Sequence, residues 1–233
     1  MAFAVAALAA ASANTTNNAA NHTGTAGTPA SGDLLLAAIQ VSGNTAVGTM
    51  SGTWSWKFLT SFPKNGGADT VFIFYAAATA ATSTTPVYAI SGNSTGSAMS
   101  VLRITGGDGT TQPYLRQFKT AIGTTANPAV TMDTAILTGN GVVGIASNTT
   151  NSAVQWTQPA SWSGEIHEVT YATPAASLQT CYRISGETGT TITWTNANVT
   201  AWGIIVMEFY IAGTGITEDG SGGTGYFGGA SSI

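Results

Sequence analysis

The stretch Ser31–Val41, SGDLLLAAIQV, holds a turn followed by an unbroken apolar run of strand length. An apolar run without polar alternation is typical of a strand that is buried on both faces. The turn contains Gly32 and Asp33, and we expect the Asp33 side chain to bond to the backbone of that turn. The sequence therefore predicts a central strand over residues 34–41.

A weaker copy of this stretch returns about 107 residues later as GNGVVGIA, residues 139–146. Similar elements follow both copies in the same order: a tryptophan-containing strand, an apolar strand, a short strand and a long closing strand. The chain thus divides into pseudo-repeats at about 32–106 and 139–212. Duplication explains this similarity, and so does convergence of two halves of one sandwich on the same pattern.

No stretch shows a sustained apolar period of 3.6 residues, and Gly or Pro interrupts nearly every window of helix length. Short strands separated by turns indicate an all-β fold. We predict a jelly-roll-like antiparallel β-sandwich built from two similar halves, as one domain over 1–212 with a polar crossing loop at 12–32. The expected strands lie at 2–10, 34–41, 53–58, 70–76, 86–90, 98–105, 114–122, 129–134, 142–147, 162–166, 179–184, 190–195 and 202–211.

The composition is poor in charge: 7% of the residues are charged and 43% are hydrophobic, whereas a soluble domain usually has roughly 25% charged residues. Hydroxyl and amide groups therefore cover most of the expected surface, as is common where much of a surface meets another subunit. The net charge is −4 and the six basic residues are scattered. A nucleic-acid partner is not expected, because it requires a basic stripe.

The two ends of the chain differ from its middle. The start, MAFAVAALAAASA, resembles the apolar core of a signal peptide, but no Lys or Arg precedes Lys57. The run is too short to span a bilayer, so we expect a first strand, no signal peptide and no membrane partner. A Gly/Ser-rich C-terminal arm occupies 213–233. Ordering such a segment costs conformational entropy, so we expect contacts with a neighbouring subunit through Tyr226, Phe227 and Ile233.

Candidate catalytic groups are few. His22 lies in the polar loop and is expected to be solvated. Glu165 and His167 would share one face of a strand, which fits either a plain surface strand or part of a site. A metal site needs three or four ligands, and the spacing suggests no third one. The sequence therefore predicts no catalytic residue, no metal site and no cofactor.

Two further residues have structural interpretations. Cys181 is the single cysteine, and its strand-like surroundings predict a buried side chain. Glu208 lies in an apolar strand, where we expect it to pair with Arg103 or Arg183 across the sheet.

Six tryptophans raise the possibility of carbohydrate binding, because sugars stack on exposed indole rings. Four of them fall at or next to matching strand positions in the two halves, which favours core packing. Trp156 lies in the loop NSAVQWTQPAS and is the one that we expect to be exposed. It is the candidate glycan contact.

The order of motifs resembles a known group of proteins. GDLLLAAI is followed by a Trp strand, by FIFYAAAT and by AWGIIVMEFYIAG before the Gly-rich arm. This order resembles a diffuse group of β-sandwich proteins encoded among the virion structural genes of tailed bacteriophages. The similarity covers about residues 1–212, and the Gly-Trp turn of the group is replaced here by Thr53-Trp54.

The resemblance implies a role in the virion. Members serve as capsid decoration proteins, head fibres, or tail and baseplate components. We therefore expect a non-enzymatic homo-oligomer, with a trimer as the expected state, that acts as a capsid decoration or cement protein or as a head fibre. It would be made in the host cytoplasm and bind the major capsid protein or other virion proteins on the particle exterior.

Two other functions stay open from the sequence. One is a tail-fibre or baseplate adhesin that binds host-surface carbohydrate. The other is a glycan-cleaving enzyme, which would require two acids that converge in one groove.

Overall fold

The fold was analysed in a computed structural model, which describes residues 3–43, 46–64, 68–106, 114–149, 156–172, 175–195 and 201–210. For residues 114, 164–172 and 175 only the backbone is described. These ranges contain sixteen strands, and every pairing between them is antiparallel. No helix among them is long and apolar enough to cross a membrane. The predicted all-β class is confirmed.

The strands divide between the two halves of the chain. The N-terminal half contains β1 (Ala4–Ala7), β2 (Ser12–Asn14), β3 (Asn21–Thr23), β4 (Leu34–Ser42), β5 (Thr49–Ser51), β6 (Lys57–Lys64), β7 (Asp69–Ala77), β8 (Val87–Ala89) and β9 (Gly96–Thr105). The C-terminal half contains β10 (Tyr114–Gly123), β11 (Ala129–Thr131), β12 (Gly141–Asn148), β13 (Ser163–Ala172), β14 (Ala175–Arg183), β15 (Thr191–Thr193) and β16 (Trp202–Tyr210).

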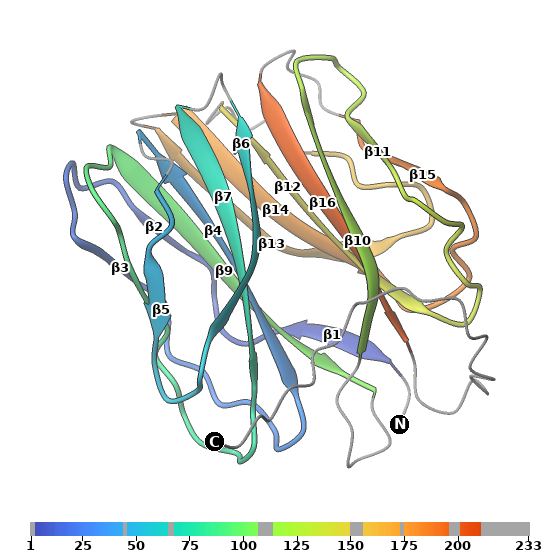
Figure 1. The fold of residues 1–233 in the computed structure, drawn as a ribbon, viewed down its shortest axis with the longest axis horizontal. Coiled ribbons are helices and arrows are strands. Elements are labelled where there is room, and N and C mark those ends of the chain that lie inside the picture. The colour runs from blue at the N-terminus through green and yellow to red at the C-terminus, as the bar shows by residue number, and fades with distance from the viewer. Residues whose placement is uncertain are drawn as a thin grey trace, which may run out of the picture.

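Two large sheets form the centre of the molecule. The N-sheet has the order β1-β9-β4-β7-β6, with β2 also paired to β9, and the C-sheet has the order β10-β16-β12-β14-β13. Two small outer sheets, β3-β8-β5 and β11-β15, lie at opposite sides of the molecule (Figure 1). The strand predicted from SGDLLLAAIQV is β4, which lies between β9 and β7 as expected for a central strand.

The two halves repeat the same arrangement. Their large sheets have corresponding strand orders, and their short strands make matching bonds. Ile90 N donates to Ala20 O, and Trp194 N donates to Pro128 O, both at 2.8 Å. Pairings in the sheets match as well. Leu35 pairs with Ala76, and Val142, which lies 107 positions after Leu35, pairs with Arg183, which lies 107 positions after Ala76.

Three apolar cores separate the four layers. The central core lies between the two large sheets and includes Leu36, Ile73, Val143 and Met207. An N-terminal outer core lies under β8, where Tyr88 packs on the N-sheet. The C-terminal outer core lies under β11 and β15. It contains four tryptophans: Trp156, Trp162, Trp194 and Trp202.

The single jelly roll expected from the sequence is not the observed connectivity. Each large sheet comes from one half of the chain alone. The physical reason lies in β4 and β12, which are buried along their whole length. Alternate side chains of such a strand point to opposite faces, so each large sheet needs cover on both faces. The other large sheet covers one face and a small outer sheet covers the other.

Two local predictions are also wrong. The predicted loop at 12–32 contains β2 and β3. The strand predicted at 53–58 is instead β6, which begins at Lys57 and extends through Pro63 and Lys64. Proline is tolerated in an edge strand because its missing N–H is not needed by a partner, and β6 is the edge strand of the N-sheet.

Candidate functional site

The prediction that His22 is solvated is wrong. His22 lies in β3 with 1% of its surface exposed. Its Nε2 is 2.8 Å from Ser12 Oγ, and its Nδ1 is 2.7 Å from Ser97 Oγ. Burial lowers the pKa of His22 to about 4, so the ring is neutral at pH 7.

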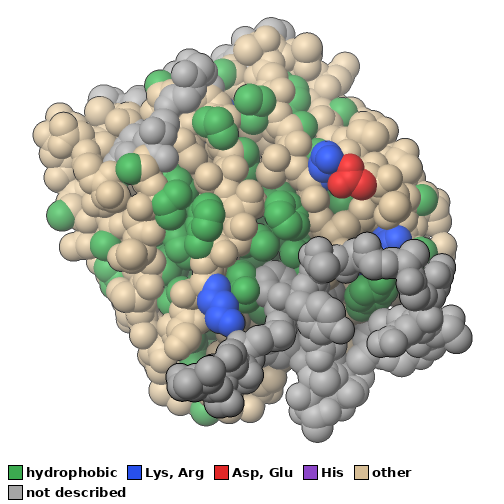
Figure 2. Space-filling model, in the orientation of Figure 1, with side chains coloured by type: hydrophobic (Ala, Val, Ile, Leu, Met, Phe, Trp, Pro, Cys, Tyr) green, Lys and Arg blue, Asp and Glu red, His purple; other side chains and the backbone are tan. Residues whose placement is uncertain are grey.

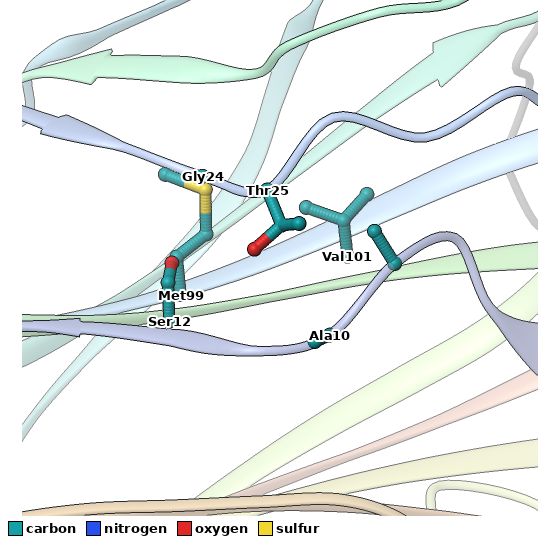
Figure 3. Close-up of a pocket in the computed structure, with 7 residues that line it drawn as sticks. Ala10, Ser12, Gly24, Thr25, Met99 and Val101 are labelled. Atoms are coloured by element: carbon teal, nitrogen blue, oxygen red, sulfur yellow. The ribbon is translucent and has the colours of Figure 1, made fainter.

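A small hollow is lined in part by Ser12, the residue that His22 Nε2 contacts (Figure 3). The hollow is lined by Ala9, Ala10, Ser12, Gly24, Thr25, Met99 and Val101 and is too narrow to hold a water molecule. A general base works best when its pKa is close to the working pH, and the pKa of His22 is too low for that role. The two serine contacts join β3 to β2 and β9, so His22 stabilises the fold.

Glu165 and His167 both lie on β13, where the structure describes the backbone of these two residues but not their side chains. The backbone of β13 is described and pairs His167 with Thr180 after an irregularity that follows Ser163. The two side chains themselves lie outside the described residues, and so do Tyr226, Phe227 and Ile233. Among the side chains that the structure describes, no group of three or more His, Cys, Asp or Glu residues could hold a metal ion.

The prediction that Trp156 is exposed is wrong. It is 3% exposed, and its Nε1 donates to Ser177 Oγ at 3.3 Å. The partly exposed tryptophans are instead Trp54 and Trp56, which pack on the N-terminal outer core just before β6. Phe58 follows them with 44% of its surface exposed. These three side chains offer an aromatic surface that a sugar ring could reach.

Glu208 has the predicted structural role but a different partner. Its fully buried carboxylate accepts hydrogen bonds from Arg116 Nη1 at 2.5 Å and from Gln117 Nε2 at 2.5 Å. Leu137 N at 2.9 Å and Asn140 Nδ2 at 2.7 Å also donate to it. Four donors use the acceptor capacity of one carboxylate, which leaves none for a substrate.

A buried polar cluster joins the two large sheets at one end. Lys64 Nζ donates to Asn148 O at 3.1 Å and lies 3.6 Å from Asp69 Oδ2. Nearby, Ser147 Oγ donates to Gln40 Oε1 at 3.0 Å. Burial lowers the pKa of Lys64 to about 8, although Asp69 opposes this effect. The bonds from Lys64 to Asn148 and from Ser147 to Gln40 cross between the halves and fix their relative position.

Cys181 is buried, which confirms the prediction of a buried side chain at this position.

A further carboxylate, Glu187, accepts hydrogen bonds from Trp162 Nε1 at 2.9 Å and from Arg183 Nη1 at 3.0 Å. Burial alone would raise the pKa of Glu187, but these bonds and two from backbone N–H groups outweigh it and lower the pKa. Glu187 thus holds a core tryptophan, which is again a structural role.

Ion pairs account for nearly all charges in the described part of the chain. Every carboxylate whose side chain is described lies in one, and Lys57 is the one described basic residue outside them. The pairs are Lys64–Asp69, Arg103–Asp33, Arg116–Glu208, Lys119–Asp133 and Arg183–Glu187. The face in Figure 2 accordingly shows few charged side chains among many uncharged ones.

The comparisons with known proteins found no relative of this chain. No family model matches the chain, and no curated protein or solved structure is significantly similar to it. A functional proposal therefore depends on the surface and the residues described above.

Proposed function

We propose that this protein is a non-enzymatic structural subunit of a tailed-bacteriophage virion, most specifically an oligomeric capsid decoration, cement or head-fibre protein. The observation that carries the proposal is the neutral surface. The described carboxylates are all in ion pairs, and hydroxyl, amide and small apolar groups cover the rest. The five carboxylates and six basic side chains that the structure describes nearly balance, so charge repulsion between copies is weak over this part of the molecule, although the whole chain has a net charge of −4.

The packing also suits a rigid subunit of a larger particle. Three apolar cores and a buried polar cluster connect four layers. The clusters that could have supplied chemistry are used inside the fold: His22 joins strands, and Glu208 is saturated by four donors.

The motif that carries the resemblance has a structural explanation. Gly32 has a φ of +89°, a conformation that favours glycine. Asp33 Oδ2 accepts a hydrogen bond from Ala30 N at 2.8 Å, so the carboxylate stabilises the turn before β4. The GDLL motif therefore sets the entry into a central strand, and its presence supports a shared scaffold with the phage group.

The test is rebinding to particles. Virions that have lost this protein would be mixed with the purified chain and separated by sedimentation. The proposal predicts saturable binding with a stoichiometry set by the particle symmetry, and stabilisation of the shell against heat. A chain that stays monomeric and does not co-sediment with the stripped particles would contradict it.

Trp54, Trp56 and Phe58 support a second candidate, a tail-fibre or baseplate adhesin. Their partly exposed rings offer stacking surface beside the uncharged hydroxyls of Thr53 and Ser55. Binding on a glycan array that disappears with Trp56→Ala but persists with Trp156→Phe would support this candidate. An array without signal would count against it.

A further inference from the structure

An apolar line follows the seam between β6 and β10, the edge strands at which the two large sheets approach each other. These strands are in contact but not paired. Leu59 of β6 and Phe118 of β10 are only partly buried against the central core. Ile122 of β10 is 56% exposed. Hydrophobic side chains gather on this face in Figure 2.

Further along, the seam is closed by Phe62 and Gly203. A Cβ at Gly203 would lie 2.6 Å from a ring carbon of Phe62 and 3.7 Å from Cγ2 of Ile122. The side chains of β6 and β10 therefore meet over β16. We call Leu59, Phe62, Phe118 and Ile122 the β6–β10 seam. Its two strands differ at Gly203, because Phe62 of β6 is buried there whereas Ile122 of β10 is open to solvent.

The strands beside the seam are poorly suited to open-ended sheet extension. Pro63 removes a donor from β6, and each strand has a register irregularity, after Phe58 in β6 and after Leu115 in β10. Proline and bulges are common devices that prevent edge strands from pairing with other chains. An occupant of the seam would therefore be held by a few anchoring side chains.

The chain contains a segment with matching chemistry. Residues 213–233 carry two adjacent aromatic residues, Tyr226 and Phe227, among small residues, with Glu218 and Asp219 and no basic residue. At the seam, Lys57 at the start of β6 is exposed and outside the described ion pairs. An acidic, aromatic segment thus complements an apolar seam that a lysine flanks.

Chain length allows this segment to reach another subunit. β16 ends at Tyr210, and Tyr226 follows 16 residues later. At about 3.3 Å per residue, this connection spans up to roughly 50 Å. A domain of this size has a radius of gyration of only about 17 Å. A connection of this length is long enough to reach a neighbouring subunit.

We infer that the β6–β10 seam is the acceptor for the C-terminal arm of a second copy of this chain, with Tyr226 and Phe227 as the anchors. The inference rests on the proposed function, because it names the contact through which the subunits associate. When Tyr226 and Phe227 of one subunit pack against the seam of another, the two aromatic rings leave water and cover the exposed Ile122. This contact links the neighbouring subunits.

The test is complementation between full-length variants, with mass measured by light scattering. An arm-defective chain carries Tyr226→Ser and Phe227→Ser, and a seam-defective chain carries Lys57→Glu and Ile122→Asn. We expect each variant alone to associate at least tenfold more weakly than the wild type. An equimolar mixture should recover a complex, since the intact arm of one chain can occupy the intact seam of the other.

The control is Val47→Asn, which changes a side chain with 46% exposure outside the seam and should leave the mass unchanged. A seam-defective chain that associates like the wild type would overturn the inference and leave the proposed function standing. Failure of the mixture to recover a complex would also overturn it, because an arm bound to its own chain cannot complement. A wild-type chain that stays monomeric at every concentration would overturn both the inference and the proposed function.

Discussion

The two halves of the chain place different charges at the same corner of the fold. In the N-terminal half, Arg103 of β9 has a side chain that is 37% exposed and lies 3.7 Å from Asp33. In the C-terminal half, Glu208 of β16 is fully buried beside Asn140. The register shows that the positions match: Leu35 pairs with Arg103, and Val142 pairs with Glu208.

The difference follows from the cover over each corner. The outer strand beside β9 is β1, which places Ala6 opposite Arg103, whereas the outer strand beside β16 is β10, which places Gln117 opposite Glu208. The β10 strand therefore brings the donors of Arg116 and Gln117 against the carboxylate, and β1 offers only a methyl group there. The continuous apolar runs of the central strands maintain the strand order in both halves. The side chains that the neighbouring strand supplies decide which charges can be buried.

Removal of the buried charge at Glu208 should give the largest difference in stability between the two halves. Glu208→Ala leaves Arg116 without its partner, and we expect a loss of about 3–5 kcal/mol in the free energy of unfolding. The matched variant Arg103→Ala breaks a partly exposed pair and should cost less than about 1 kcal/mol. Urea unfolding measures both values. Equal losses would show that the two corners are not differently covered.

The outer cores differ in pH dependence. His22 pairs with Tyr88, and at the matching place in the other half Val130 pairs with Ile192. The pKa of His22 is about 4 in the folded state, whereas a free histidine side chain has a pKa of 6.5. Between these values only the unfolded chain binds the proton, so stability is lost as the pH falls from 6.5 to 4, by about 3 kcal/mol in total.

His22→Val should remove the loss of stability between pH 6.5 and 4, because valine binds no proton. Valine also occupies the matching position, Val130, in the C-terminal half. Stability curves of both proteins at about pH 7, 6 and 5 provide the measurement, above the range in which most carboxylates titrate. If the two curves run parallel through this range, His22 is not the group that responds.

The matching positions Ala37 and Gly144 test the tryptophan core. Both belong to central strands, but a Cβ at Gly144 would lie 2.6 Å from Trp194 and 2.8 Å from Trp162. Gly144→Ala should therefore cost about 1–3 kcal/mol through overpacking. Ala37→Gly has no such clash and should cost at most about 1 kcal/mol. A stabilising Gly144→Ala would mean that the two indoles are free to move apart.

The sequence predicted most of the long strands, because continuous apolar runs are local properties, but it placed the strand that is β6 four residues too early. It missed β2 and β3, which have three residues each and contain mainly polar side chains. It also missed that each half builds its own large sheet. A continuous apolar run shows that a strand has two buried faces, but it does not show which layer covers each face.

The predictions for Trp156 and Glu208 were wrong because they depend on contacts with residues that are distant in the sequence. Trp156 was expected to be exposed because it lies in a polar loop, but Ser177 of a distant strand holds its indole inside the outer core. The partner of Glu208 was missed because of the register irregularity between Leu115 and Gln117, which falls at Arg116. Such a bulge has no clear sequence signal.

The central claim, that uncharged surfaces and the arm assemble this protein, is tested most directly by its mass in solution at different salt concentrations. Sedimentation velocity would be run on the full chain at about 0.05 M and about 1 M salt. The account predicts an oligomer, with a trimer expected, whose association weakens only slightly over this range, because salt screens the one exposed contact of Lys57 with the acidic arm but not the apolar contacts. A monomer at both concentrations, or an oligomer that dissociates at the higher one, would contradict it.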